Sequence, residues 1–236
     1  MNPKDLPGGT IMNASSSHFT RRQFLKAAAI TAGAAGLVVA GASVLGSQPE
    51  KIFLTNSTYG DGSMNQKVLV AYASRAGSTM GVAEAVGKTL AQAGASVDVC
   101  QVDAVKDLGS YDAVVVGSAI QGQKWLPEAL QFVRRHQSEL SRRPFASFMV
   151  CITLSMANAD RYREGLKAWM RPVRDLVPPV SEGYFAGALD FSKIPFSFNS
   201  LAMRMVVLTG AWKQGDHRDW NAIRQWAQDL APLMKL

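Results

Sequence analysis

Residues 74–79 carry the clearest chemistry in this sequence. They read SRAGST, so three hydroxyl side chains, at Ser74, Ser78 and Thr79, accompany small residues that let the backbone curl. An apolar run precedes this loop and a segment with helical spacing follows it, which places the positive end of a helix dipole behind the loop. Backbone N–H groups and hydroxyls in that arrangement bind anions, phosphate above all. A Ser/Thr-rich helix cap without a ligand is the alternative, because these residues are common at helix starts.

Other chemistries find less support in the sequence. The loop lacks the GK[ST] of a triphosphate-binding loop and the GxGxxG of a dinucleotide site. A Ser/His/Asp set, an HExxH motif or a carboxylate pair does not stand out, which argues against hydrolase and metal chemistry. His136 follows Arg134 and Arg135 on the polar side of an expected helix, so we expect it to face solvent. His217 precedes the last helix and is expected to cap it.

Strands and helices alternate from Lys67 onward, and this order positions the loop. Apolar runs predict strands over 67–73, 96–102, 111–119, 144–154 and 181–190. Helical spacing predicts helices over 82–94, 126–140, 158–176 and 219–234, the last with Asp219 as N-cap. The alternation predicts one α/β domain over 67–236, with a doubly wound parallel five-stranded sheet in the order 2-1-3-4-5. The ligand crevice then lies at the carboxyl ends of strands 1 and 3.

The N-terminal region resembles an export signal. Residues 20–26 read TRRQFLK and match the twin-arginine pattern S/T-R-R-x-F-L-K, followed by an uncharged stretch over 27–46 that is mostly Ala and Gly. We therefore expect contact with the twin-arginine export machinery, and a periplasmic protein or one tethered to the outer face of the cytoplasmic membrane. Ala40–Ala42 offers a small-x-small cleavage site before Ser43, so cleavage of the signal region (1–46) at that site and its retention as an anchor are the two alternatives. The polar residues 47–66 predict a linker.

The amino-acid composition and net charge limit which classes of partner the protein is expected to bind. Of the 236 residues 47% are hydrophobic and 18% charged, which fits a globular protein. The net charge of +7 is scattered without a Lys/Arg block, so we expect no nucleic-acid partner. Cys100 and Cys151 lie in apolar runs at no metal-like spacing, and we expect buried thiols.

Three stretches resemble a known family. They are YASRAGST after the first strand, VVVGSAIQGQKWLPEALQFVRRHQSEL over 114–140, and GDHRDWNAIRQWAQDL over 215–230. Together they are similar to the flavodoxin-like FMN-binding family, and within it to the flavodoxin-domain group that includes menaquinone-dependent protoporphyrinogen IX dehydrogenase. The resemblance covers 67–236 and implies FMN as the cofactor.

The resemblance also implies a set of cofactor-binding residues. One group would bind the FMN phosphate: Ser74, Arg75, Ala76, Gly77, Ser78 and Thr79. Two further loops would border the isoalloxazine ring and present backbone N–H groups to its edges: Ser118, Ala119, Ile120, Gln121, Gly122 and Trp125, then Thr153, Leu154 and Ser155. For Trp125 the alternative to stacking on the flavin is a role as the first core anchor of the following helix.

Residues 191–215 are longer than the matching connection of a short flavodoxin. They contain three Phe, one Trp and two Met with few charges. The family resemblance implies an insertion for a hydrophobic substrate or for membrane contact, although this segment is less basic and aromatic than the family pattern. A helical flap over the sheet edge is the alternative.

The functional expectation is an exported FMN-binding oxidoreductase or electron-transfer flavoprotein with a quinone-like or other hydrophobic acceptor. The sequence does not indicate the donor. The alternatives are a protoporphyrinogen-dehydrogenase-like enzyme and a flavin-free interaction module with the same fold.

Overall fold

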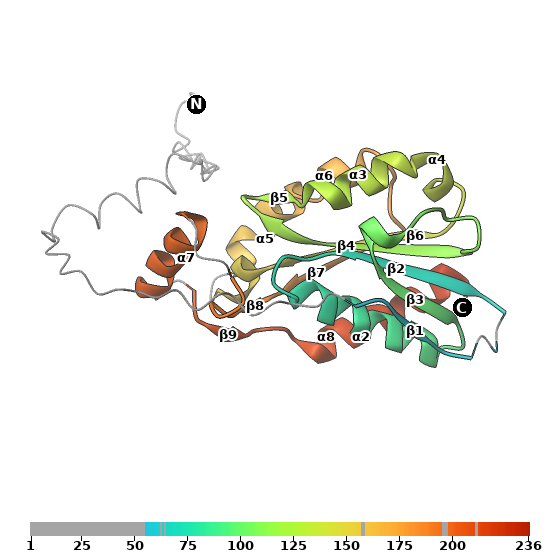
Figure 1. The fold of residues 1–236 in the computed structure, drawn as a ribbon, viewed down its shortest axis with the longest axis horizontal. Coiled ribbons are helices and arrows are strands. Elements are labelled where there is room, and N and C mark those ends of the chain that lie inside the picture. Colours follow the sequence, from blue (N-terminus) through green and yellow to red (C-terminus); the bar gives the residue numbers. More distant parts are fainter. Residues whose placement is uncertain (1–54, 62, 64, 157–158, 195–197, 211) are drawn as a thin grey trace, which may run out of the picture. The chain divides into compact units, whose positions relative to one another are not determined.

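The computed structural model describes residues 55–236 except 62, 64, 157–158, 195–197 and 211, so the predicted leader lies outside the described residues. A parallel sheet forms the centre of the described domain. Its five long strands are β2 (Lys67–Ala73), β3 (Ser96–Gln101), β4 (Ala113–Gln121), β6 (Phe145–Cys151) and β7 (Ser181–Ala186). They lie in the order β3-β2-β4-β6-β7, which is the predicted order 2-1-3-4-5. The predicted fold class is therefore confirmed (Figure 1).

Helices cover both faces of the sheet. One face carries α2 (Ser78–Gln92) and α8 (Trp220–Leu230), and the other carries α3 (Pro127–Arg135) and α6 (Arg171–Arg174) (Figure 1). The side chains of β2 alternate between the two cores: Val68, Val70 and Tyr72 pack on the side of α2 and α8, and Leu69, Ala71 and Ala73 on the other side. A strand buried on both faces reads as a continuous apolar run, which is why Lys67–Ala73 lacks alternation.

The predicted linker is wrong for part of its length. Ser57–Tyr59 forms strand β1, which pairs antiparallel with β3 and adds an edge strand to the sheet. Asp98 of β3 holds it, because the Asp98 carboxylate accepts a hydrogen bond from Thr58 Oγ1 at 2.7 Å. The Tyr72 hydroxyl also donates to the Thr55 carbonyl at 2.9 Å. These partners lie far away in sequence, so the polar composition of the segment did not reveal the strand.

Several predicted elements are shorter or interrupted. The predicted helix over 126–140 is divided into α3 and α4 (Gln137–Leu140), and the one over 158–176 into α5 (Ala159–Ala168) and α6. Pro172 lies in α6, and it lacks the N–H that would continue α5. The end of the predicted fourth strand is a 3₁₀ turn, Ile152–Ser155. Asp219 caps α8 as predicted, since its carboxylate accepts from the backbone N–H groups of Asn221 and Ala222.

The predicted fifth strand continues past β7 into a separate two-stranded ribbon. There β8 (Ala188–Leu189) pairs antiparallel with β9 (Gly215–Asp216). Between them the insert contains α7 (Phe198–Leu208). Another short strand, β5 (Lys124–Trp125), forms a hairpin with β4. A 3₁₀ turn, Ala231–Met234, follows α8. Within the described residues, none of the helices has the length and apolarity needed to cross a membrane.

Candidate functional site

The sheet brings the three predicted loops to one edge. In the parallel pairing Ala73 of β2 lies opposite Ser118 of β4, and Ala119 of β4 lies opposite Val150 of β6. Each of these residues stands at or near the carboxyl end of its strand. The segments that follow them, 74–77, 119–123 and 152–155, therefore leave the sheet on the same side. This is the crevice position that the fold uses for ligands.

The first loop has the backbone geometry of an anion cradle. Gly77 has φ 76°, a left-handed conformation that other residues adopt at a cost, and it turns the chain into α2. The first N–H groups of an α-helix have no partner within the helix, so those of Ser78, Thr79 and Met80 are available to a ligand. The first turn of α2 contains no acidic residue, which leaves the positive end of its dipole uncompensated there.

The three hydroxyls of the loop play different parts. Ser78 Oγ accepts a hydrogen bond from the Ala188 N–H at 2.9 Å, so it joins the loop to β8. Ser74 is buried at 7% exposure. Thr79 is fully buried, and its Oγ1 has no hydrogen-bond partner among the residues that the structure describes. An unpaired buried hydroxyl costs about 1–3 kcal/mol. Thr79 is the second residue of α2, so its hydroxyl belongs to the same turn as the N–H groups that a phosphate would meet.

The Arg75 side chain is directed away from the cradle. Its Nη1 lies 2.6 Å from Glu128 Oε1, and its Nη2 donates to Glu128 Oε2 at 3.0 Å. Glu128 stands in the first turn of α3, so this pair links the loop over 74–79 to the helix layer on the opposite face of the sheet from α2. The backbone of Arg75 thus remains in the predicted site, but its guanidinium is ion-paired with Glu128. The backbone groups of Ala76 and Gly77 complete the loop.

The second loop is a tight hairpin between β4 and β5. Gly122 and Gln123 have φ 57° and 65°, and residues 121–124 are exposed. Ser118 Oγ accepts from the Leu126 N–H at 3.0 Å and donates to the Ala119 carbonyl at 2.8 Å. Ser118 therefore positions the hairpin, and Ile120 is partly exposed beside it.

Trp125 is not placed to stack on a flavin. It is 4% exposed, and its Nε1 donates to Met170 Sδ at 3.3 Å. Its neighbours in the core include Leu126, Ala129 and Met149. The structure thus supports the alternative that Trp125 anchors α3, and the assignment of its side chain to the cofactor is corrected.

The third loop is the 3₁₀ turn that contains Thr153, Leu154 and Ser155, all partly exposed. Ser155 Oγ donates to the Ile152 carbonyl at 2.8 Å, and Leu154 packs against the core cluster of Trp125. Cys151, which precedes the turn, is buried as predicted, and burial raises the pKa of its thiol. Cys100 is only partly buried, and burial again raises its thiol pKa.

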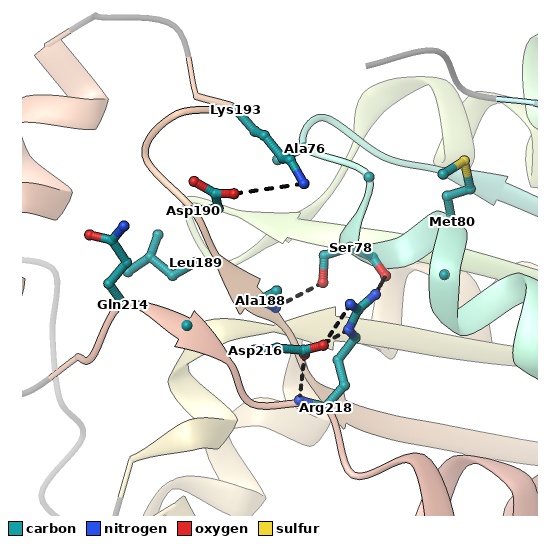
Figure 2. Close-up of a pocket in the computed structure, with 13 residues that line it drawn as sticks. Ala76, Ser78, Met80, Ala188, Leu189, Asp190, Lys193, Gln214, Asp216 and Arg218 are labelled. Carbon is teal, nitrogen blue, oxygen red and sulfur yellow. Dashed lines mark hydrogen bonds and ion pairs between the residues drawn. The ribbon is translucent and has the colours of Figure 1, made fainter. Parts of the chain in front are cut away.

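Sequence reasoning missed the residues that lie on the other side of the loop over 74–79. A cavity of about 790 Å³ lies between this loop and the β8–β9 ribbon, and Figure 2 shows its lining side chains. Arg218 forms an ion pair with Asp216 at 2.7 Å, and Lys193 lies 3.7 Å from Asp190. Hydrogen bonds from Arg218 hold the pKa of the Asp216 carboxyl below its ordinary value. The D-x-R spacing of Asp216 and Arg218 was the one sequence signal of this contact.

His136 and His217, the two histidines in the described part of the chain, lie in separate settings. His136 is only 5% exposed, so the expectation that it faces solvent is wrong. Its Nδ1 lies 2.7 Å from Glu139 Oε2, and its ring lies 4.8 Å from the Phe132 ring. His217 Nε2 lies 2.8 Å from the Lys213 carbonyl. Across the part of the chain that the structure describes, no group of three His, Cys, Asp or Glu residues is arranged to hold a metal ion.

Comparison with known proteins agrees with this architecture. The flavodoxin domain family matches residues 69–217. A protoporphyrinogen IX dehydrogenase [quinone] of Leishmania major is 27% identical over 180 residues, which cover 72% of this chain and 77% of that protein. The Escherichia coli K12 protein of the same name is 22% identical over 180 residues, covering 71% and 96%.

Solved structures of flavodoxins are similar at low identity. A short-chain flavodoxin associated with a bacterial microcompartment has a TM-score of 0.47 at 12% identity, covering 72% of this chain and 99% of that one. Flavodoxin 2 of Bacillus cereus has a TM-score of 0.44 at 15% identity, covering 72% and 97%. The family assignment rests on the domain match, which spans more than half of the chain. The chain therefore belongs to the flavodoxin domain family.

Proposed function

We propose that this chain is an exported FMN-binding oxidoreductase or electron-transfer flavoprotein. The observation that carries the proposal is the cradle at the start of α2, with free N–H groups, an uncompensated helix dipole and the unpartnered Thr79 hydroxyl. The flavodoxin domain match supports FMN as the cofactor. When bound, FMN supplies the redox chemistry.

The chain's own residues bind and orient the cofactor. The first N–H groups of α2 and the Thr79 hydroxyl would donate hydrogen bonds to the phosphate. Ser118 and the hairpin turn at Gly122 hold one border of the crevice, and the 3₁₀ turn over 152–155 holds the other. The Ser118 bond anchors the hairpin and the 3₁₀ turn directly follows β6, so both borders would hold a bound ring at one edge of the sheet.

The acceptor in this proposal is a quinone-like or other hydrophobic molecule. Helix α7 carries Met205 at 50% and Leu208 at 79% exposure. Contiguous exposed apolar surface favours contact with an apolar partner or a membrane surface, and these two side chains on one short helix support that proposal. The insert over 191–215 is thus the proposed contact segment.

Two other functions remain as alternatives. The named relatives favour protoporphyrinogen IX oxidation, at 27% and 22% identity. A flavin-free interaction module is the second, and in it the Ser/Thr loop only caps α2.

The first experiment asks whether flavin is bound. The full chain is purified and its absorbance at about 450 nm, where oxidised flavin absorbs, is recorded. The released cofactor is then identified by chromatography against FMN and riboflavin standards. The colourless protein is also titrated with FMN by fluorescence quenching. A protein that takes up no FMN at micromolar concentration supports the interaction module and contradicts the proposal.

Thr79→Val tests the cradle itself. Valine keeps the β-branched shape but removes the unpartnered hydroxyl, so the flavin-free protein becomes as stable or more stable while FMN affinity falls about three- to tenfold. Thr89→Val is the matched control on the same helix, because Thr89 Oγ1 already donates to the Ala85 carbonyl at 2.9 Å. An equal FMN affinity for wild type and Thr79→Val removes Thr79 from the site.

Reduction assays then separate the redox alternatives. The flavin-loaded protein is mixed with NADH, NADPH or a quinol, and in turn with protoporphyrinogen IX and a quinone. Quinone-dependent turnover of protoporphyrinogen IX supports the enzyme named among the relatives. Turnover with a quinone but not with protoporphyrinogen IX supports the broader proposal.

Export is the third part of the proposal and rests on the twin-arginine pattern. A double Arg21→Lys, Arg22→Lys variant is expected to accumulate inside the cell, because that route reads the arginine pair. Cell fractionation measures this directly. Unchanged export of the variant contradicts the proposed route and leaves the flavin proposal intact.

A further inference from the structure

Ser78, the first residue of α2, is held from outside the phosphate loop. The Ala188 N–H donates to Ser78 Oγ at 2.9 Å, and Arg218 Nη1 donates to the Ser78 carbonyl at 3.3 Å. These partners lie 110 and 140 positions further along the chain. Both belong to the β8–β9 ribbon or directly follow it, as Figure 2 shows. The ribbon that brackets the insert is therefore bonded to the turn that starts α2.

Arg218 is itself rigidly oriented. Its Nε donates to Asp216 Oδ1 at 2.8 Å and its Nη2 to Asp216 Oδ2 at 2.7 Å, which is a two-pronged pair. Its guanidinium lies 4.3 Å from the centre of the Trp220 ring, and its side chain is 16% exposed. A guanidinium held by two bonds and one ring has little freedom, so Nη1 is presented to Ser78 in one position.

Gly81 provides the space for this contact. A Cβ at Gly81 would collide with Arg218 Nη1 and lie 3.6 Å from Trp220. The colliding atom is the end of an arginine side chain and not backbone, so the clash is relieved when the guanidinium leaves its bonds to Asp216 and Ser78, and α2 itself need not move. Alanine also favours helix over glycine. Gly81→Ala is thus expected to displace Arg218 while the helix and the total charge stay as they are.

We infer that Arg218 is a positioning residue that sets the preference of this site for FMN over the unphosphorylated flavin, riboflavin. Through Ser78 it fixes the turn whose N–H groups would bind phosphate, while its own charge is paired with Asp216. Riboflavin shares the ring and ribityl chain but has no phosphate to meet this turn. Loss of the Arg218 contact therefore weakens FMN binding and leaves riboflavin binding unchanged. The inference rests on the proposed function, since it concerns the phosphate end of the same site.

The test measures the dissociation constants of FMN and riboflavin by fluorescence quenching for the full flavin-free chain and its variants. For Arg218→Ala the expected result is a rise of about three- to tenfold for FMN and no change for riboflavin, as expected for one lost hydrogen bond near a charged ligand. Arg224→Ala is the matched control on α8, because Arg224 Nη2 donates to Asn221 Oδ1 at 2.7 Å on the same helix. It should keep the wild-type ratio of the two constants.

Two further variants separate position from charge. Gly81→Ala keeps the charge and is expected to lower the preference for FMN, whereas Gly165→Ala changes a helical glycine with open space around it and is expected to have no effect. Arg218→Lys also keeps the charge but cannot bond Asp216 and Ser78 in the same way, so the preference should stay below wild type. Thermal unfolding of each flavin-free variant shows whether it is folded. If Arg218→Ala is not folded, the Gly81→Ala variant provides the test.

The outcomes are distinct. A wild-type preference in Arg218→Ala and Gly81→Ala overturns the inference, and so does an equal loss of affinity for both flavins, which marks a general structural role. Full restoration by Arg218→Lys assigns the effect to charge and overturns the positioning role. If the wild-type protein binds neither flavin, the proposed function has failed, and this inference fails with it.

Discussion

Replacing Trp125 by Phe tests whether this residue belongs to the core or to the flavin site. The indole is 4% exposed and its N–H donates to Met170 Sδ at 3.3 Å, so Phe loses that bond and part of the packing while keeping an aromatic ring. We expect the free energy of unfolding to fall by about 1–2 kcal/mol. At roughly 2–4 °C per kcal/mol for a domain of this size, the melting temperature falls by about 2–8 °C. FMN affinity and flavin fluorescence should stay as in wild type.

The assay combines thermal unfolding of the flavin-free protein with FMN titration. Trp226→Phe is the matched control on the opposite face of the sheet, because its Nε1 donates to Ser181 Oγ at 3.0 Å and it packs edge-on against Phe148 and Phe185. Both variants should lose stability and keep FMN. A Trp125→Phe protein with normal stability but altered flavin fluorescence, or an FMN affinity at least about tenfold weaker, shows that Trp125 contacts the ring and refutes the reasoning.

Three further predictions concern the loop and the sheet. Gly77→Ala places a β-carbon at φ 76°, so we expect about 1–2 kcal/mol of lost stability and weaker FMN binding, measured by unfolding and titration. Gly117→Ala drives a β-carbon into the Phe148 ring and should cost about 1–3 kcal/mol, and an unchanged melting temperature contradicts this packing. Burial raises the pKa of the Asp98 carboxyl, but hydrogen bonds from Thr58, Lys67 and Tyr111 outweigh burial and hold it below its ordinary value. A lowered pKa gives stability that is present above the unfolded value of about 4 and is lost as pH falls through the folded value, so acid denaturation curves below about pH 4 should be flatter for Asp98→Asn.

Local pattern was enough for the sheet and for its central loop. The apolar run at Lys67–Ala73, the alternation of strands with helices and the SRAGST loop predicted the strand order and the edge where the loops meet. Each of these signals depends on neighbours in sequence, because a doubly buried strand must be apolar throughout and a helix start must have a cap or a ligand.

Distant contacts decided the rest, and single residues show why. Ser57–Tyr59 has the composition of a polar linker, yet it pairs with β3, where Thr58 Oγ1 donates to the Asp98 carboxylate. His136 reads as a surface residue beside two arginines, yet the ring of Phe132 and the carboxylate of Glu139 bury it. Arg75 and Trp125 have the residue types expected at a flavin site. However, the Arg75 guanidinium is ion-paired with Glu128, and the Trp125 indole N–H donates to Met170 Sδ.

The sequence by itself determined the α/β class, the order of the five long strands and the place of the SRAGST loop at the start of α2, since periodicity and a helix start depend on neighbouring residues. Only the tertiary structure decided which hydroxyl is free and which is occupied. Ser78 is bonded to Ala188 and reached by Arg218, while Thr79 is left without a partner among the described residues. The physical reason is that a hydrogen bond forms between groups that folding brings within about 3 Å, and separations of 110 and 140 residues leave no periodic signal.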